Sequence, residues 1–192
     1  MNVKENQRTR LSKRMFRSAL LELLEEKGGI EKISVRELCQ RAELNRSTFY
    51  AHYTEPREVL AEAENELLGE TAAHIQKIGA QMAGGGKEFL ASFLRYIREN
   101  DKIFRVLLVT AADPAFKSRF IQLSFLQIFE HLQIQTDAEK QQYIYSYLLN
   151  GSLGVLTQWI RSDYAAAVPQ IVNLLFTINS AAILPLVKGE QP

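Results

Sequence analysis

The sequence predicts an all-α fold of about nine helices, because apolar residues recur at helical spacing through most of the 192-residue chain. Glycine runs and capping residues divide these stretches into separate helices. Alternation of apolar and polar residues, which would indicate half-buried strands, is nowhere sustained. Hydrophobic residues make up 46% of the chain, which is enough for a sizeable core.

The first helix is expected over residues 9–26. Gly28 and Gly29 end it, in the position where glycine commonly follows a helix. Its apolar residues repeat every four positions and form one stripe: Leu11, Met15, Ala19 and Leu23.

Two short helices are expected next. The Ser34 hydroxyl can accept from the amide of Glu37, and the Glu37 carboxylate can reach back to the Ser34 amide, which makes a capping box. After a three-residue turn, Asn45 can cap a second short helix over residues 46–52. This arrangement is typical of a helix-turn-helix, although an ordinary helical hairpin fits the periodicity equally well. The small core of such a unit would contain Leu38, Cys39, Ala42, Leu44, Phe49 and Tyr53.

A longer helix is expected from Pro56 to Met82. Thr54 can cap it, and proline is tolerated in a first turn because its missing N–H would be unpaired there. The triple glycine at residues 84–86 is the clearest break in the chain. Further helices are expected over residues 87–99, 102–110, 114–133, 138–161 and 165–186.

Basic side chains concentrate at the N-terminus. Residues 1–20 hold six basic side chains and one acidic one, whereas residues 61–192 hold 11 basic and 13 acidic ones. A basic arm ahead of a mildly acidic body is typical of a protein that contacts a polyanion with one end. A solvated terminal tail is the alternative.

From Arg8 to Leu68 the chain resembles the N-terminal domain of the TetR/AcrR family of transcriptional regulators. The likeness rests on Glu-Lys-Gly at residues 26–28, on the capped helix at residues 34–42, and on the segment at residues 44–53. The order Thr-Phe-Tyr-x-His-Tyr within that last segment is its most specific part.

The resemblance implies contacts with double-stranded DNA. In the family, the residues that match Arg46, Ser47 and Thr48 face the major groove, and those that match Tyr50 and His52 contact backbone phosphates. Phosphate contacts would then fix the register while the first three read bases. The expected DNA-binding residues are Ser34, Val35, Arg36, Asn45, Arg46, Ser47, Thr48, Tyr50, His52 and Arg57.

The chain departs from the family pattern in two places. The family usually has glycine in the turn, where this chain has Glu43, and a non-glycine residue at positive φ costs roughly 1–2 kcal/mol. The turn is therefore expected to have a slightly different shape. The family usually places lysine at the start of the fourth helix, where this chain has Pro56 followed by Arg57. Arg57 is therefore the expected substitute for that phosphate contact.

The resemblance also implies two domains, a DNA-binding domain at residues 1–68 and a regulatory domain at residues 69–192. Residues 104–116 and 147–159 resemble a subgroup that includes regulators related to the dihydroxyacetone-kinase operon activator. Gly151 and Gly154 each cost roughly 1 kcal/mol in a helix relative to alanine. Close approach of another backbone, space for a ligand, or a local kink would each account for both glycines.

The last two helices carry broad apolar faces, which predict a two-fold four-helix interface with a second copy. The expected partners are this second copy, a palindromic double-stranded operator with half-sites about 34–36 Å apart, and an unidentified small-molecule effector. The predicted function is a ligand-responsive dimeric repressor; an activator of the same family or a helical adaptor without DNA binding is the alternative. A ligand pocket is expected among Phe93, Tyr96, Phe104, Leu107, Phe125, Tyr147, Asn150 and Trp159, although most of these also fit an ordinary core.

The sequence indicates neither an enzyme nor a protein with a metal or cofactor. Cys39 is the only cysteine, so no internal disulfide can form, which suits a reducing cytosol. His52, His74 and His131 are too scattered for a zinc site. The Gly-Gly-Gly-Lys run at residues 84–87 lacks the spacing of a phosphate loop. With no expected signal peptide or membrane-spanning run, we predict a cytoplasmic protein that associates with the nucleoid when bound to DNA.

Overall fold

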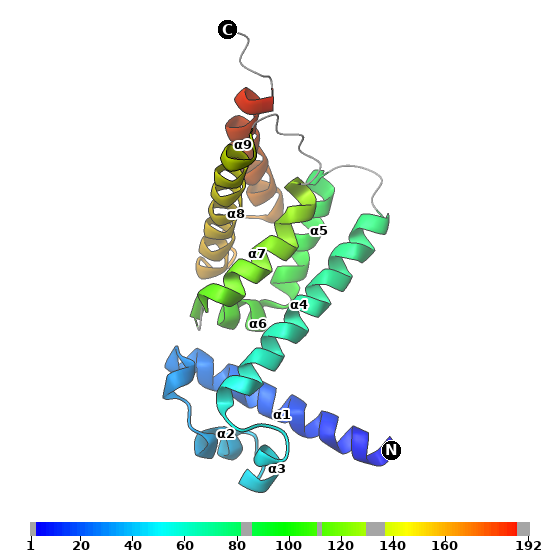
Figure 1. Ribbon diagram of the computed structural model, residues 1–192, viewed down its shortest axis with the longest axis vertical. Coiled ribbons are helices and arrows are strands. Elements are labelled where there is room, and N and C mark those ends of the chain that lie inside the picture. The colour runs from blue at the N-terminus through cyan, green and yellow to red at the C-terminus, as the bar shows by residue number, and fades with distance from the viewer. Residues whose placement is uncertain (1–2, 82–85, 111–112, 130–136, 188–192) are drawn as a thin grey trace. The chain divides into compact units, whose positions relative to one another are not determined.

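The computed structural model describes residues 3–81, 86–110, 113–129 and 137–187, and within these ranges all regular secondary structure is helical (Figure 1). The predicted all-α class is confirmed. The elements in chain order are α1 (Val3–Lys27), the 3₁₀ turn η1 (Ile30–Lys32), α2 (Val35–Arg41), α3 (Arg46–Tyr50), α4 (Pro56–Gln81), α5 (Gly86–Glu99), α6 (Asp101–Arg105), the π-helical turn η2 (Val106–Thr110), α7 (Pro114–Phe129), α8 (Ala138–Arg161) and α9 (Val168–Val187).

Two compact units make up the chain. The N-terminal unit comprises Met1–Gly69 together with Arg105–Asp113, and the C-terminal unit comprises Glu70–Phe104 and Pro114–Pro192. Residues 105–113 belong to the first unit because η2 packs against α1. The buried residues Val106, Leu107 and Leu108 are the apolar part of this turn.

The core of the N-terminal unit forms around one stripe of α1. Phe16 is fully buried. Its ring packs edge to face with the rings of Phe49 of α3 and Tyr53, at centroid distances of 5.4 and 6.1 Å. Burial of a large apolar side chain contributes about 1.5–3 kcal/mol, so this trio holds the short helices on α1. The remaining buried side chains of the unit include Leu20, Leu24, Leu38, Cys39 and Ala42.

The N-terminal end of α1 differs from the expectation. The helix begins at Val3, not at residue 9, and Leu11 is 47% exposed although its spacing placed it in the buried stripe. In Figure 1 the first turns of α1 extend beyond α2 and α3. Helical periodicity identifies a shared face, but the length of the covering elements decides how much of that face is buried.

The start of α4 also differs from the expectation. Its first helical residue is Pro56, so Thr54 lies one position too early to be the N-cap. The backbone amide and the hydroxyl of Thr54 instead both donate to the Glu58 carboxylate, at 2.7 Å each. These bonds lower the pKa of Glu58 below its ordinary value.

In the C-terminal unit, α5 packs on α9, α7 packs on α8, and α8 packs on α9. Lys87 links α5 to α9, because its Nζ donates to Asn173 Oδ1 at 3.2 Å and lies over the Phe176 ring at 5.7 Å. The last helix begins at Val168, three residues later than expected. Asp163 and Tyr164 adopt left-handed backbone conformations after α8, and Pro169 then occupies the first turn of α9.

Candidate nucleic-acid interface

The N-terminus of α2 carries both halves of the predicted capping box. The Glu37 amide donates to Ser34 Oγ at 3.3 Å, and the Ser34 amide donates to Glu37 Oε2 at 3.1 Å. Lys27 at the end of α1 donates to Glu37 Oε1 at 2.6 Å. The Lys27 bond, followed by those from Ser34, lowers the pKa of Glu37 from 4.5 to about 2. The start of α2 is thereby fixed to the end of α1.

The first turn of α2 presents the side chains that the sequence assigned to flanking DNA. Ser34 and Arg36 are exposed and Val35 is half-buried, while Leu38 and Cys39 face the core. Burial raises the pKa of the Cys39 thiol, so this lone cysteine is a packing residue and not a reactive thiolate.

The turn between α2 and α3 is built around a strained residue. Glu43 has φ 54°, the left-handed conformation in which the family usually has glycine. Its amide donates to Gln40 O at 3.3 Å, and the Leu44 amide donates to Cys39 O at 3.0 Å. This positive φ costs a non-glycine residue roughly 1–2 kcal/mol. Leu44 is half-buried, so it covers the rim of the core.

Asn45 caps α3 and also orients two hydroxyl groups. Its Oδ1 accepts from the Thr48 amide at 2.7 Å, from Thr48 Oγ1 at 2.7 Å and from Ser47 Oγ at 2.8 Å. Because both hydroxyl protons point to Asn45, each hydroxyl offers only its lone pairs outward. In this arrangement Ser47 and Thr48 can accept hydrogen bonds, as from the amino groups of adenine or cytosine in the major groove.

The outer surface of α3 is formed by the residues predicted from the sequence. Arg46 and Ser47 are exposed, and Tyr50 is 60% exposed. The Tyr50 and Phe49 rings meet edge to face with their centroids 5.5 Å apart, which anchors this exposed side chain. His52 is half-buried, with its ring 6.3 Å from that of Tyr53. Arg57, in the first turn of α4, is exposed.

The predicted ligand-pocket residues divide between several places. Phe93, Tyr96 and Phe104 lie together in the C-terminal unit, whereas Leu107 belongs to the N-terminal unit. The side chain of Phe125 lies outside the described residues.

The remaining three predicted pocket residues belong to α8. Tyr147 and Asn150 are exposed, and Asn150 donates back to Ser146 O at 2.8 Å. Trp159 is buried, and its Nε1 donates to Ala166 O at 2.7 Å after α8 has ended.

The aromatic cluster of the C-terminal unit contains residues that sequence reasoning missed. Phe120 contacts the rings of Phe93, Phe104 and Phe116, at centroid distances of 6.3, 5.7 and 6.2 Å. His74 stacks on Tyr96 at 4.0 Å, and burial lowers the pKa of its imidazole. His74 lies on α4 and Tyr96 on α5, so periodicity within either helix gave no signal for this contact.

Exposed apolar side chains of the C-terminal unit gather on its last two helices. Tyr143 and Tyr147 are exposed on α8, and Leu174 and Ile178 are exposed on α9. Gly151 and Gly154 lie on the exposed part of α8, and a Cβ added to either would meet nothing within 4 Å. Within one chain, neither the close approach of a backbone nor local crowding accounts for these glycines.

None of the helices in the described ranges has the length and apolar character needed to cross a membrane. The described side chains also contain no group of three or more His, Cys, Asp or Glu residues placed to hold a metal ion.

Residues 87–180 match the family model TetR_C_8, described as a transcriptional regulator C-terminal region. The fold is similar to that of a TetR transcriptional regulator from Streptococcus agalactiae 2603V, with a TM-score of 0.68 and 21% identity over 91% of this chain and 97% of the other. It is also similar to the dihydroxyacetone kinase operon activator DhaS, with a TM-score of 0.54 and 15% identity over the same shares of the two chains. None of the curated proteins matches the sequence.

Proposed function

We propose that the chain is a transcriptional regulator of the TetR family that binds double-stranded DNA through α2 and α3. The observation that carries this proposal is the outer surface of α3. There Arg46, Ser47 and Tyr50 are exposed on a helix whose opposite side is fixed by the buried ring of Phe49. The family is one of transcription regulators and not of enzymes.

We assign different tasks to the side chains of this surface. Arg46, Ser47 and Thr48 read base edges, because an arginine fork and two oriented hydroxyls match the groups of the major groove. Tyr50, His52 and Arg57 contact phosphates and fix the register. Ser34, Val35 and Arg36 at the start of α2 contact the flanking DNA strand. Asn45 orients the hydroxyls of Ser47 and Thr48 that read bases.

The second part of the proposal is a homodimer formed by α8 and α9. The exposed apolar side chains of these helices support it, as does the open space at Gly151 and Gly154, where a second backbone can approach closely. A two-fold dimer requires a palindromic operator, with half-sites about 34–36 Å apart or slightly more. The protein then acts in the cytoplasm and associates with the nucleoid when it is bound to its operator.

The third part is control by a small-molecule effector in the C-terminal unit. The aromatic cluster around Phe93, Tyr96 and Phe104 is the proposed location of the effector site, since ligand pockets are lined mainly by apolar and aromatic groups. The exposed positions of Tyr147 and Asn150 make them better candidates for the dimer face. We propose repression as the output. Activation is the second candidate, favoured by the fold similarity to an operon activator.

Fluorescence anisotropy with DNA from upstream of its own gene tests the proposal. A protein that contacts 6–10 phosphates loses about 10³–10⁵ in affinity between roughly 50 and 200 mM salt. Tyr50→Phe and His52→Ala should weaken binding to all sequences, whereas Arg46→Ala and Thr48→Ala should also change the preferred sequence. Equal losses on every sequence for all four variants would contradict the division of tasks. Absence of salt-sensitive binding, with genomic footprinting also negative, would favour a helical adaptor.

A further inference from the structure

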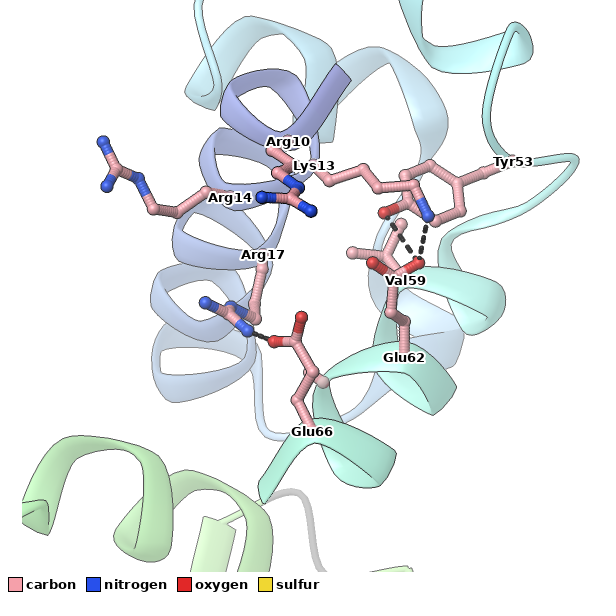
Figure 2. A pocket seen from close by; sticks show the side chains of 9 residues that line it. Arg10, Lys13, Arg14, Arg17, Tyr53, Val59, Glu62 and Glu66 are labelled. Carbon is pink, nitrogen blue, oxygen red and sulfur yellow. Dashed lines mark hydrogen bonds and ion pairs between the residues drawn. The ribbon is translucent and has the colours of Figure 1, made fainter. Parts of the chain in front are cut away.

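A hollow of about 350 Å³ lies between α1 and the beginning of α4 in the N-terminal unit (Figure 2). Four basic side chains of α1 line it: Arg10, Lys13, Arg14 and Arg17. Their spacings of three and four residues place them on neighbouring positions of one helix surface. Glu62 and Glu66 line the hollow from α4, four residues apart.

Both carboxylates already have basic partners. Lys13 Nζ donates to Glu62 Oε2 at 2.8 Å, and Arg17 pairs with Glu66. Among the described residues, no carboxylate is paired with Arg10 or Arg14, so the hollow keeps two uncompensated positive charges. Figure 2 shows Arg14 pointing away from the two glutamates, whereas the guanidinium of Arg10 lies beside Lys13 on the side of the hollow.

These features suit a phosphate group. Arginine presents a planar fork of donors that binds phosphate oxygens in pairs, and lysine adds a compact charge. Ion pairs at the partial exposure of Lys13 and Glu62, about one third for each side chain, contribute little to stability. A phosphate can therefore share Lys13 and Arg17 with their glutamates without a large loss.

We infer that this hollow is an anion site that takes a phosphate group, with Arg10 as its uncompensated ligand and with Lys13 and Arg17 as shared ligands. The phosphate belongs either to a small free anion or to a DNA backbone, since both offer the same oxygens. The inference does not rest on the proposed base and phosphate contacts, because none of those residues lines the hollow.

Isothermal titration calorimetry of the full chain with pyrophosphate, at constant ionic strength, tests the free-anion source. We expect Arg10→Gln to weaken binding by about 10-fold or more, as for loss of a charge-assisted hydrogen bond. Glu66→Gln should strengthen binding by about 2- to 3-fold, because it releases Arg17 from a competing carboxylate. Arg95→Gln is the matched control, since Arg95 is an exposed arginine on α5.

The DNA source is tested with the same variants by the salt dependence of operator binding. If the phosphate belongs to DNA, Arg10→Gln should reduce the salt slope by about one released counterion, and Arg95→Gln should leave it unchanged. If the chain binds no DNA, calorimetry with pyrophosphate still tests the anion site. Failure of the proposed function is then distinguished from failure of this inference. The inference is overturned if Arg10→Gln changes neither measurement, or if Arg95→Gln changes them equally.

Discussion

The hydroxyl of Tyr53 donates to Glu62 Oε2 at 3.2 Å, and this is the same oxygen that receives Lys13 Nζ. One carboxylate oxygen of α4 therefore holds both α1 and the segment that leaves α3. Burial, followed by the nearby Glu62 charge, raises the pKa of Tyr53 well above its usual range. The phenol consequently stays protonated at neutral pH and remains a donor.

Tyr53→Phe should destabilise the N-terminal unit while leaving its ring packing in place. The variant removes one hydrogen bond to a charged acceptor, and we expect a loss of about 1–2 kcal/mol in the free energy of unfolding. Urea denaturation followed by circular dichroism measures it. Tyr50→Phe is the matched control, because Tyr50 is 60% exposed on α3 of the same unit. A Tyr53→Phe chain as stable as the wild type would show that the bond contributes nothing.

Lowering the pH should weaken the attachment of α2 to the end of α1, which Glu37 makes with Lys27. Its pKa is about 2 in the folded chain and near 4.5 when unfolded, so its stabilising effect is complete above pH 4.5. That effect is lost as the pH falls from about 4.5 to about 2, when the carboxylate becomes protonated. The stability difference between wild type and Glu37→Gln, measured by urea denaturation at each pH, should shrink over this window. A constant difference would contradict the assigned role of Glu37.

Replacement of Glu43 separates backbone strain from charge. Glu43→Gly relieves roughly 1–2 kcal/mol of strain at positive φ and costs roughly 0.5–1 kcal/mol of unfolded-chain entropy, so we expect a net gain of about 0.5–1 kcal/mol. Glu43→Ala removes the same charge but keeps a Cβ in the left-handed conformation. Both variants should bind DNA more tightly at low salt, and only the glycine variant should melt at a higher temperature.

Asn45 offers a test of the hydroxyl arrangement on α3. Asn45→Ala removes the N-cap and should cost about 1 kcal/mol in stability. Asn45→Asp keeps an acceptor for the Thr48 amide and should preserve stability, but it places a negative charge beside the proposed base contacts. Thermal melts and anisotropy on one operator fragment distinguish these effects. Equal DNA affinity for wild type and Asn45→Asp would exclude α3 from the DNA contact.

Local chemistry accounts for what the sequence predicted well. The capping box of Ser34 and Glu37 and the Asn45 cap each depend on residues within a few positions of one another. Such features can be read along the chain because the backbone itself brings the groups together.

Long-range packing accounts for what the sequence did not provide. Lys13 and Glu62 are 49 residues apart, and each alone resembles a solvated surface charge. The π-helical turn η2 was part of a predicted helix over residues 102–110, because its apolar spacing does not distinguish α from π geometry. Likewise, Tyr147 is a large aromatic residue of a kind that is often buried. It is exposed because the packing of α8 on α7 and α9 leaves this position uncovered.

The proposed dimer predicts that a charge on α9 will dissociate the protein. Leu174 is 46% exposed and lies four residues before the exposed Ile178, so Leu174→Glu places an unpaired carboxylate within the proposed four-helix interface. Leu11→Glu is the matched control, because Leu11 is 47% exposed but belongs to α1. In sedimentation equilibrium we expect a dimer for the wild type and for Leu11→Glu, and a monomer for Leu174→Glu. A dimer for Leu174→Glu, with the same dissociation constant as the wild type, would place the interface on another surface.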